Sequence, residues 1–299
     1  MNTRQIQYVV ELAKDRNFSQ TAERLGITQP ALSKHILALE KELGVKLFDR
    51  STSPMQLTAA GEHFVRQAQD LLYREDQLLR SLEAYKSGES GRLVIGISPF
   101  RSQYMIPDVV RQVRGRYPDV QVVLHEPASD QLRAEAAEGK YDFAVVNLPV
   151  DEAVLDVIPL EADEMVLVVP AAMAMDLPKE EELDLGVCAH LPFVTVEQPL
   201  EMRRQFDAAC TAAQFRPQIA VEVGGLTSAW AQCRAGVGAT LLPRQFVCHN
   251  EGNKEVVLYA LKQPMQSRQP VIVTRRGQYL SPYAAYAIQL LTERKDETK

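Results

Sequence analysis

Apolar side chains recur at helical spacing through the first forty residues of the chain. This periodicity predicts one helix over residues 6–16 and a third over residues 29–43. Between them, Ser19 is expected to cap a second helix over residues 20–25. Gly26 follows as a residue suited to the left-handed turn that ends a helix. Two helices that meet across a short glycine turn have the spacing of a helix-turn-helix.

The next residues predict a wing beside these helices. Strand-like stretches over 45–50 and 55–57 flank a polar turn. Gln29 and Lys34 lie on the outward face of the third helix, where such side chains suit adenine and guanine edges. Arg50 is expected at a minor groove or a phosphate. The candidate DNA-binding residues are Ser19, Thr28, Gln29, Pro30, Ser33, Lys34, Arg50, Ser51 and Ser53.

A long helix is predicted over residues 59–85, followed by a hinge at 87–91. Apolar residues recur along it every seven positions, a pattern typical of pairing with another helix. A second copy of the chain offers that helix, although packing on its own domain is the alternative. A homodimer would present two reading helices to an inverted-repeat operator in double-stranded DNA. The two rows are Phe64, Leu71, Leu78 and Tyr85, and beside them Val65, Leu72 and Leu79.

Strand-like and helical stretches alternate beyond residue 91, which predicts parallel sheets covered by helices and grouped into two α/β lobes. The last strand and the terminal helix are expected to return to the first lobe. The expected strands are 93–97, 120–124, 143–146, 165–169, 219–221, 239–242 and 271–273. The expected helices are 105–116, 131–138, 200–213, 228–235 and 282–294.

Ligands of such sheets bind where strands end and helices begin. Arg101 is a candidate counter-charge for a carboxylate, and Glu197 could select a polar or cationic group. Each serine or threonine could equally be an ordinary helix cap. The candidate ligand-binding residues are Ser98, Pro99, Phe100, Arg101, Ser102, Ser129, Asn147, Thr195, Val196, Glu197, Gly224 and Thr227.

The formal net charge of −6 would disfavour a nucleic-acid partner if it were uniform. Residues 1–58, however, hold eight Lys and Arg against six Asp and Glu. The four cysteines lack metal or disulfide spacing, and neither a signal segment nor a membrane-spanning run is visible. We therefore expect a cytoplasmic protein with no membrane association.

Catalysis is not expected, nor is a cofactor or a metal. The run Gly96-Ile97-Ser98-Pro99-Phe100 lacks the closing glycine of a nucleophile elbow. No phosphate-binding loop occurs, and the five histidines lack metal spacing. Two alternatives stay open. One is a solute-binding protein, and the other is a redox-sensing regulator that uses Cys188 and Cys210.

The run FSQTAERLGITQPALSKHILALEKELGVKLFDRSTSPMQLTAAG from Phe18 to Gly61 resembles the DNA-binding domain of LysR-type transcriptional regulators. Lys34 stands where this family often has Arg, which keeps the charge but loses the planar fork. Short runs from Gly91 to Pro243 resemble the family's effector domain.

The resemblance implies a winged helix-turn-helix and a linker helix, followed by an α/β domain of the type 2 periplasmic-binding-protein fold. It also implies a small effector between the lobes, control of transcription, and a homodimer or homotetramer. The expected domains are 1–58 for DNA binding, 59–90 for the linker helix and hinge, and 91–299 for the effector. Lobe I takes about 91–161 and 268–299, and lobe II takes about 162–267.

Overall fold

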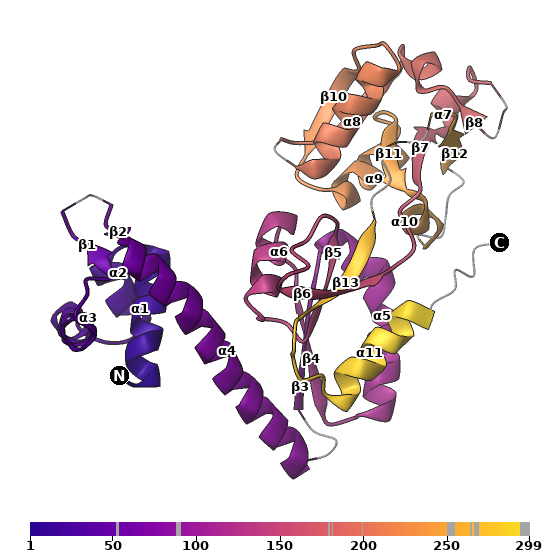
Figure 1. Cartoon of the computed structure of the whole chain (residues 1–299). Helices are drawn as coiled ribbons and strands as arrows, with labels where there is room; N and C mark the ends of the chain where they lie inside the picture. The colour runs from indigo at the N-terminus through magenta and orange to yellow at the C-terminus, as the bar shows by residue number, and fades with distance from the viewer. Residues whose placement is uncertain are drawn as a thin grey trace. The chain divides into compact units, whose positions relative to one another are not determined.

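In the computed structural model, the chain divides into two compact units, Met1–Gly88 and Glu89–Lys299 (Figure 1). The structure describes residues 1–51, 54–87, 91–178, 180, 182–198, 200–249, 255–263, 265 and 269–293. The first unit consists of α1 (Thr3–Asp15), α2 (Phe18–Arg24), α3 (Gln29–Leu43), β1 (Phe48–Asp49), β2 (Gln56–Leu57) and α4 (Ala59–Ser87). The expected winged helix-turn-helix is confirmed.

Helix α2 begins earlier than the sequence analysis placed it, because Asn17 and not Ser19 caps it. The Asn17 side chain accepts hydrogen bonds from the backbone amides of Ser19 (3.0 Å) and Gln20 (3.2 Å). The turn into α3 uses Gly26 with φ +67°, as expected. The core of this unit is closed by the inward faces of α1 and α3, where Leu12, Leu32, Ile36 and Leu39 are fully buried.

The wing is shorter than the sequence predicts, with two residues in each strand. The reason is Glu40, a buried residue of α3. Its carboxylate accepts hydrogen bonds from the backbone amides of Leu47 (2.8 Å) and Phe48 (3.1 Å), so the chain before β1 is bonded to α3. Ser53 lies outside the described residues.

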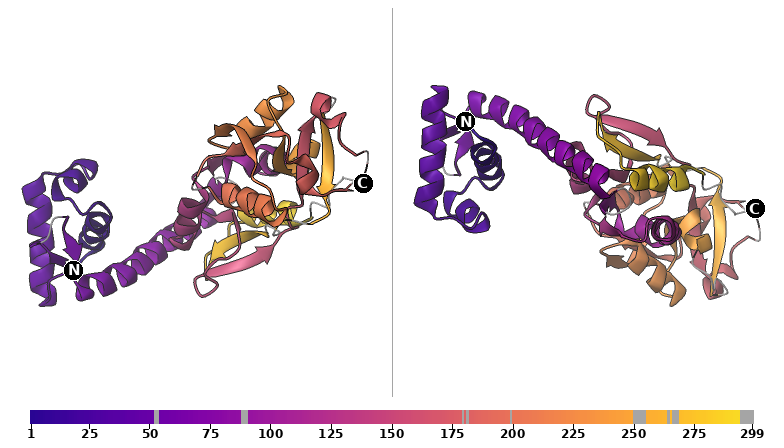
Figure 2. Two further views of the ribbon diagram at one scale, coloured as in Figure 1. Left: turned by 90° about the horizontal axis from the view of Figure 1, so that it is seen from above. Right: turned by 90° about the horizontal axis from the view of Figure 1, so that it is seen from below.

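Helix α4 satisfies both interpretations of its apolar pattern, with different residues. Near its start, Phe64, Ala68 and Leu72 pack against Ile6 and Val10 of α1. From Leu71 onward, three of the expected seam residues are exposed: Leu71 (49%), Leu78 (60%) and Leu79 (57%). The side chain of Tyr85 is outside the described residues. This helix therefore packs on its own domain with one set of residues and presents an apolar row to solvent with another. Figure 2 shows α4 running out beyond the other helices of the first unit.

Lobe I of the second unit is built on a five-stranded sheet in the order β4-β3-β5-β13-β6. Its last strand and α11 come from the C-terminal part of the chain, so the expected return to lobe I is confirmed. The elements are β3 (Gly91–Ile97), α5 (Pro99–Arg116), β4 (Val120–His125), α6 (Ser129–Ala137), β5 (Phe143–Asn147), β6 (Leu155–Pro159), β13 (Pro270–Arg275) and α11 (Pro282–Glu293).

Lobe II holds a four-stranded sheet in the order β11-β7-β12-β8 and a parallel pair, β9 and β10. Its strands are β7 (Met165–Pro170), β8 (Glu182–Leu183), β9 (Pro192–Val196), β10 (Gln218–Val223), β11 (Thr240–Pro243) and β12 (Val256–Leu261). Its helices are α7 (Ala171–Ala174), the 3₁₀ turn η1 (Leu185–Cys188), α8 (Glu201–Ala212), α9 (Leu226–Arg234) and α10 (Arg244–His249).

The prediction of parallel sheets is wrong for part of each lobe. In lobe I, β13 runs antiparallel to both β5 and β6, and in lobe II, β11 and β12 run antiparallel to β7. Parallel neighbours need a returning helix between them, whereas β13 enters lobe I directly from lobe II. The strands that link the lobes therefore break the parallel order.

Helix α5 belongs to lobe I but packs into lobe II as well. Its residues Phe100 and Tyr104 join an apolar cluster with Trp230 of α9 and Phe246 of α10. The rings of Phe100 and Phe246 lie 4.4 Å apart between centroids. This cluster ties the two lobes together beside the strands that cross between them.

Candidate DNA-binding surface and effector site

Helix α3 separates its two faces completely. Inward-facing Leu32 and Ile36 are fully buried, while Gln29, Pro30 and Lys34 are exposed. The outward face forms an open, shallow surface lined by Gln29, Pro30, Ser33, Lys34, Leu37, Ala38 and Lys41. A single helix thus offers amide, hydroxyl and ammonium groups in the way that major-groove readers do.

The sequence analysis missed two residues of this face, Leu37 and Lys41. Leu37 is 51% exposed, which is unusual for a leucine on a helix whose other leucines are mostly buried. An apolar side chain on a reading face can contact the methyl group of thymine. The signal was available, since Leu37 falls off the apolar stripe that includes Ile36.

The other predicted DNA-binding residues have different surroundings. Ser19 and Thr28 are exposed near the starts of α2 and α3, and the Thr28 side chain makes no capping hydrogen bond. Ser51 donates to Asp49 within the wing (2.6 Å). These positions stay predictions for contact with DNA.

Arg50 has a structural contact that the sequence analysis did not foresee. Its guanidinium lies 3.4 Å from the carboxylate of Glu40 and over the ring of Phe18, at 5.1 Å from the centroid. The side chain is 36% exposed, so one part stays open to solvent. Arg50 therefore ties the wing to the helices, and any contact with DNA would use the remaining exposed part.

The predicted effector residues of lobe I lie where strands end, and neither Ser98 nor Ser129 makes the side-chain bond of an ordinary helix cap. Ser98 follows β3 and makes no side-chain capping bond to α5. Ser129 is the first residue of α6, and the capping position belongs to Ala128. Half-buried Ser98, Ser102 and Ser129 therefore have hydroxyl groups that are not used as caps.

In lobe II, Thr195 and Val196 are buried residues at the end of β9, a strand that is not among those expected from the sequence. Glu197 follows, and its amide donates to the carbonyl oxygen of Val223 at 2.9 Å. A Cβ atom placed on Gly224 would lie 3.7 Å from the Glu197 carboxylate, so these two residues are neighbours. β9 and β10 thus bring their ends together.

One hydrogen bond between the lobes reaches a predicted effector residue of lobe II. Gln103 of α5 donates a hydrogen bond to the hydroxyl of Thr227, at the start of α9, at 2.9 Å. Gln103 follows Ser102 directly and was not predicted. Thr227 therefore already has a partner from lobe I in this conformation.

The prediction that Arg101 provides a counter-charge is corrected by its ion pair. Arg101 is 3% exposed, and its guanidinium donates to Asp163 (2.5 Å) and to Asn147 (2.7 Å). Asn147, another predicted effector residue, is thus occupied in holding Arg101. A carboxylate already neutralises this arginine, so its charge is not available to a ligand anion.

Three of the four cysteines are buried. Burial raises the pKa of the Cys188 thiol to about 11, and of the Cys210 and Cys233 thiols to about 12. Such thiols stay protonated near neutral pH and react slowly with oxidants. Cys248 on α10 is exposed.

Among the described residues, His, Cys, Asp and Glu side chains form no group of three that could hold a metal ion. None of the helices in that part of the chain combines the length and the apolar composition that a membrane span requires.

Two family descriptions cover nearly the whole chain. "Bacterial regulatory helix-turn-helix protein, lysR family" matches residues 3–62, and "LysR substrate binding domain" matches residues 86–296. The chain belongs to the LysR family. It is a LysR-type transcriptional regulator with an N-terminal helix-turn-helix and a C-terminal domain of the effector-binding type.

Full-length LysR-type proteins are similar to it throughout. The HTH-type transcriptional regulator YcgK of Bacillus subtilis is 29% identical over 100% of this chain and 96% of its own length. A hydrogen peroxide-inducible genes activator of Pectobacterium carotovorum is 30% identical over 93% and 91%. The solved structure of a full-length OxyR variant from Pseudomonas aeruginosa superposes with a TM-score of 0.67 at 26% identity, over 98% and 93%. These relatives are named as regulators of genes and not as enzymes.

Proposed function

We propose that this LysR-type regulator binds operator DNA as a homodimer, with α3 of each copy in the major groove of one half of an inverted repeat. The observation that carries the proposal is the exposed polar face of α3 above a fully buried apolar face. The exposed row Leu71, Leu78 and Leu79 on α4 supports pairing of two copies along this helix. Two such dimers would form the homotetramer expected for the family. A protein that binds operator DNA works where that DNA is, so the proposal includes a cytoplasmic location.

We further propose that a small anion binds between the lobes and changes DNA binding. Support comes from hydroxyl groups at the starts of α5 and α6, and from the N-terminus of α9 at Thr227, since helix N-termini favour negative charge. Arg101 takes no part. The ligand is instead recognised by backbone amides and by Ser98, Ser102, Ser129 and Thr227. Displacing Gln103 from Thr227 would couple binding to the spacing of the lobes.

The DNA-binding proposal is tested with the full-length protein, DNA from upstream of its own gene, and a shuffled duplex in a salt series. Gln29→Ala is expected to lower affinity for the specific duplex by about tenfold, since a bidentate base contact contributes roughly 1–3 kcal/mol. Gln67→Ala, an exposed glutamine of α4, is the control and should bind normally. Equal affinity of wild type for both duplexes would leave only phosphate attraction and would reject the proposal.

The effector proposal is tested by melting the protein with inorganic phosphate and a panel of small carboxylates. An anion that raises the melting temperature should lose that effect in Thr227→Ala but keep it in Thr292→Ala, whose hydroxyl donates within α11. The same anion should change DNA affinity. An unchanged response in Thr227→Ala would place the anion elsewhere.

Redox sensing is the second candidate, because hydrogen peroxide-inducible genes activators are 30% identical to this chain. The buried, protonated thiols of Cys188, Cys210 and Cys233 argue against it. Peroxide is therefore expected to leave DNA affinity unchanged. A peroxide response that Cys188→Ser or Cys210→Ser removes would favour redox sensing instead.

A further inference from the structure

Arg50, which directly follows the wing strand β1, is held by residues of two helices. Its Nη2 atom lies 3.4 Å from Oε2 of Glu40 on α3, and its guanidinium carbon lies 5.1 Å from the centre of the Phe18 ring on α2. The helix-turn-helix, and not the wing alone, therefore sets the position of this arginine.

Glu40 can hold an arginine in place because its own carboxylate is fixed. Its side chain is 8% exposed, and Oε1 accepts hydrogen bonds from the backbone amides of Leu47 (2.8 Å) and Phe48 (3.1 Å). These two bonds keep the carboxylate from rotating, so Oε2 stays directed at Arg50. Glu40 belongs to the buried side of α3, and the reading surface is the exposed side of the same helix. The place of Arg50 is thus fixed relative to that surface.

Phe18 supports the flat side of the guanidinium. Its half-buried ring packs against the core of the first unit, and Arg50 lies over it in the manner of a cation–π contact. The Arg50 side chain is nevertheless 36% exposed, and among the described residues its guanidinium donates to Glu40 alone. Donors therefore remain for an anion that approaches from solvent. An arginine that is already ordered loses little conformational freedom when it binds one.

We propose that Phe18 and Glu40 are positioning residues, which hold Arg50 ready to bind a backbone phosphate of the DNA beside the groove that α3 reads. This inference rests on the proposed binding of α3 to an operator. A phosphate suits this arginine better than a base edge, because a guanidinium held against the helices cannot extend into a minor groove. A guanidinium with a fixed plane can offer two parallel hydrogen bonds to phosphate oxygens.

The phosphate contact is tested with the full-length protein on DNA from upstream of its own gene and on a shuffled duplex, in a salt series. Arg50→Ala is expected to lower affinity about tenfold on both duplexes. It should also reduce the slope of log affinity against log salt by about 1, since one phosphate is no longer neutralised. Arg114→Ala removes the same charge from an exposed position of the second unit and should change neither quantity. An unchanged slope in Arg50→Ala, or a loss confined to the specific duplex, would overturn the phosphate contact.

The positioning role of Phe18 is tested by a double-mutant cycle. Phe18→Leu keeps an apolar side chain but removes the ring, and should lower affinity for both duplexes about threefold. Phe18→Tyr keeps the ring and should retain wild-type affinity. In the Arg50→Ala background, Phe18→Leu should have no further effect, because the arginine that the ring positions is gone. Equal losses with and without Arg50 would show that Phe18 only stabilises the fold, and would overturn its positioning role.

Glu40→Gln keeps an acceptor for the two wing amides but removes the charge that faces Arg50. It should also lower affinity about threefold in the wild-type background and have no effect beside Arg50→Ala. If Glu40→Gln does not fold, the Phe18 cycle alone decides. The proposed function fails by a different result, since it requires that wild type prefers the specific duplex and that Gln29→Ala reduces this preference. A preference that Gln29→Ala reduces, together with an Arg50→Ala variant that binds both duplexes normally, would reject only the inference about Arg50.

Discussion

The two units build their candidate sites in different ways. In the first, one face of α3 supplies the reading surface from residues 29–41, and the opposite face closes the core. In the second, the candidate residues stretch from Ser98 to Thr227, and several of them, including Arg101, Asn147 and Thr195, are buried polar groups of the fold itself. Function and stability should therefore be separable by mutation in the first unit and entangled in the second.

The sharpest challenge to this comparison is Asp163→Ala. Removing this carboxylate leaves the buried guanidinium of Arg101 without its ion-pair partner, which costs about 3–5 kcal/mol of unfolding free energy. Urea denaturation of the second unit measures the loss. The neighbouring Glu164→Ala breaks only an exposed pair with Arg244 and should cost less than about 1 kcal/mol. Equal losses in the two variants would mean that the buried pair has no special role.

The first unit offers a pair of leucines that separates stability from binding. Leu32→Ala empties a fully buried position and should cost about 2–5 kcal/mol. Leu37→Ala, on the same helix but 51% exposed, should change stability by less than about 0.5 kcal/mol and weaken binding to operators with a thymine opposite it. Denaturation and DNA titration of both variants give the comparison. A strongly destabilised Leu37→Ala would show that the reading face is also structural.

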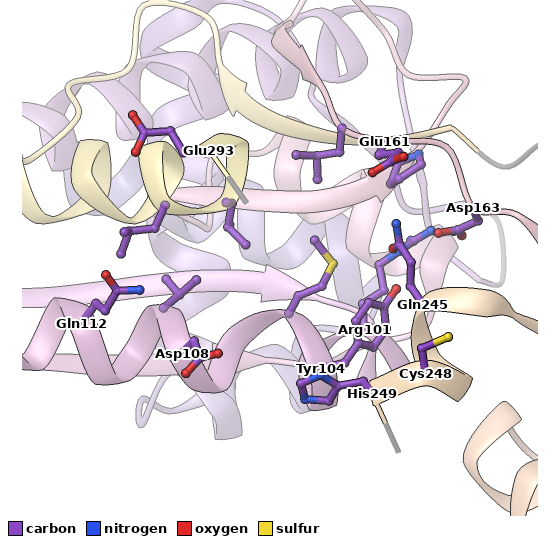
Figure 3. Close-up of a pocket in the computed structure, with 16 residues that line it drawn as sticks. Arg101, Tyr104, Asp108, Gln112, Glu161, Asp163, Gln245, Cys248, His249 and Glu293 are labelled. Atoms are coloured by element: carbon purple, nitrogen blue, oxygen red, sulfur yellow. The ribbon is translucent and has the colours of Figure 1, made fainter. Parts of the chain in front are cut away.

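The two units also differ in how much of their structure could be predicted from the sequence. The helices of the first unit were predictable because their periodicity, Gly26 and Pro30 act within a few residues. The pairing of Arg101 with Asp163 was not predictable, since the two residues are 62 positions apart. They meet only in the folded domain, where the chain passes from lobe I into β7 of lobe II (Figure 3). The same applies to β13, whose antiparallel direction depends on the chain crossing between lobes. Ser19 and Ser129 show the limit of local rules, because a neighbouring residue occupies the capping position in each case.

A glycine near the wing gives a smaller effect in the first unit. A Cβ atom on Gly61 would lie 2.0 Å from the carbonyl oxygen of Leu47, so Gly61→Ala must push α4 away from the wing, at about 1–3 kcal/mol. Gly115, also in a helix, has nothing within 4 Å of an added Cβ. Gly115→Ala should therefore stabilise the second unit by up to about 1 kcal/mol. If the melting temperatures of Gly61→Ala and Gly115→Ala shifted in the same direction, the close contact between Gly61 and Leu47 would be contradicted.

The smallest effect concerns a carboxylate on α6, the helix that begins at Ser129. Burial raises the pKa of Glu135, but hydrogen bonds from Lys140 (2.8 Å), Tyr141 and Gln131 (3.2 Å) outweigh it and lower the pKa to about 2. Because the folded pKa lies below the unfolded value of 4.5, the stabilisation is complete above about pH 4.5 and is lost as the pH falls toward 2.

Lys140 is 44% exposed, and water therefore limits the contribution of Glu135 to about 1 kcal/mol. Glu135→Gln should be less stable than wild type at pH 6, and the difference should shrink steadily from about pH 4.5 to about pH 3. Glu126→Gln, an exposed carboxylate of the same lobe, should follow the wild-type pH profile. A gap between wild type and Glu135→Gln that stays constant with pH would show that Glu135 acts by packing. In that case the charge of Glu135 would not contribute to the stability of α6. Stability and function would then be separable in this helix too, and the contrast between the two units would weaken.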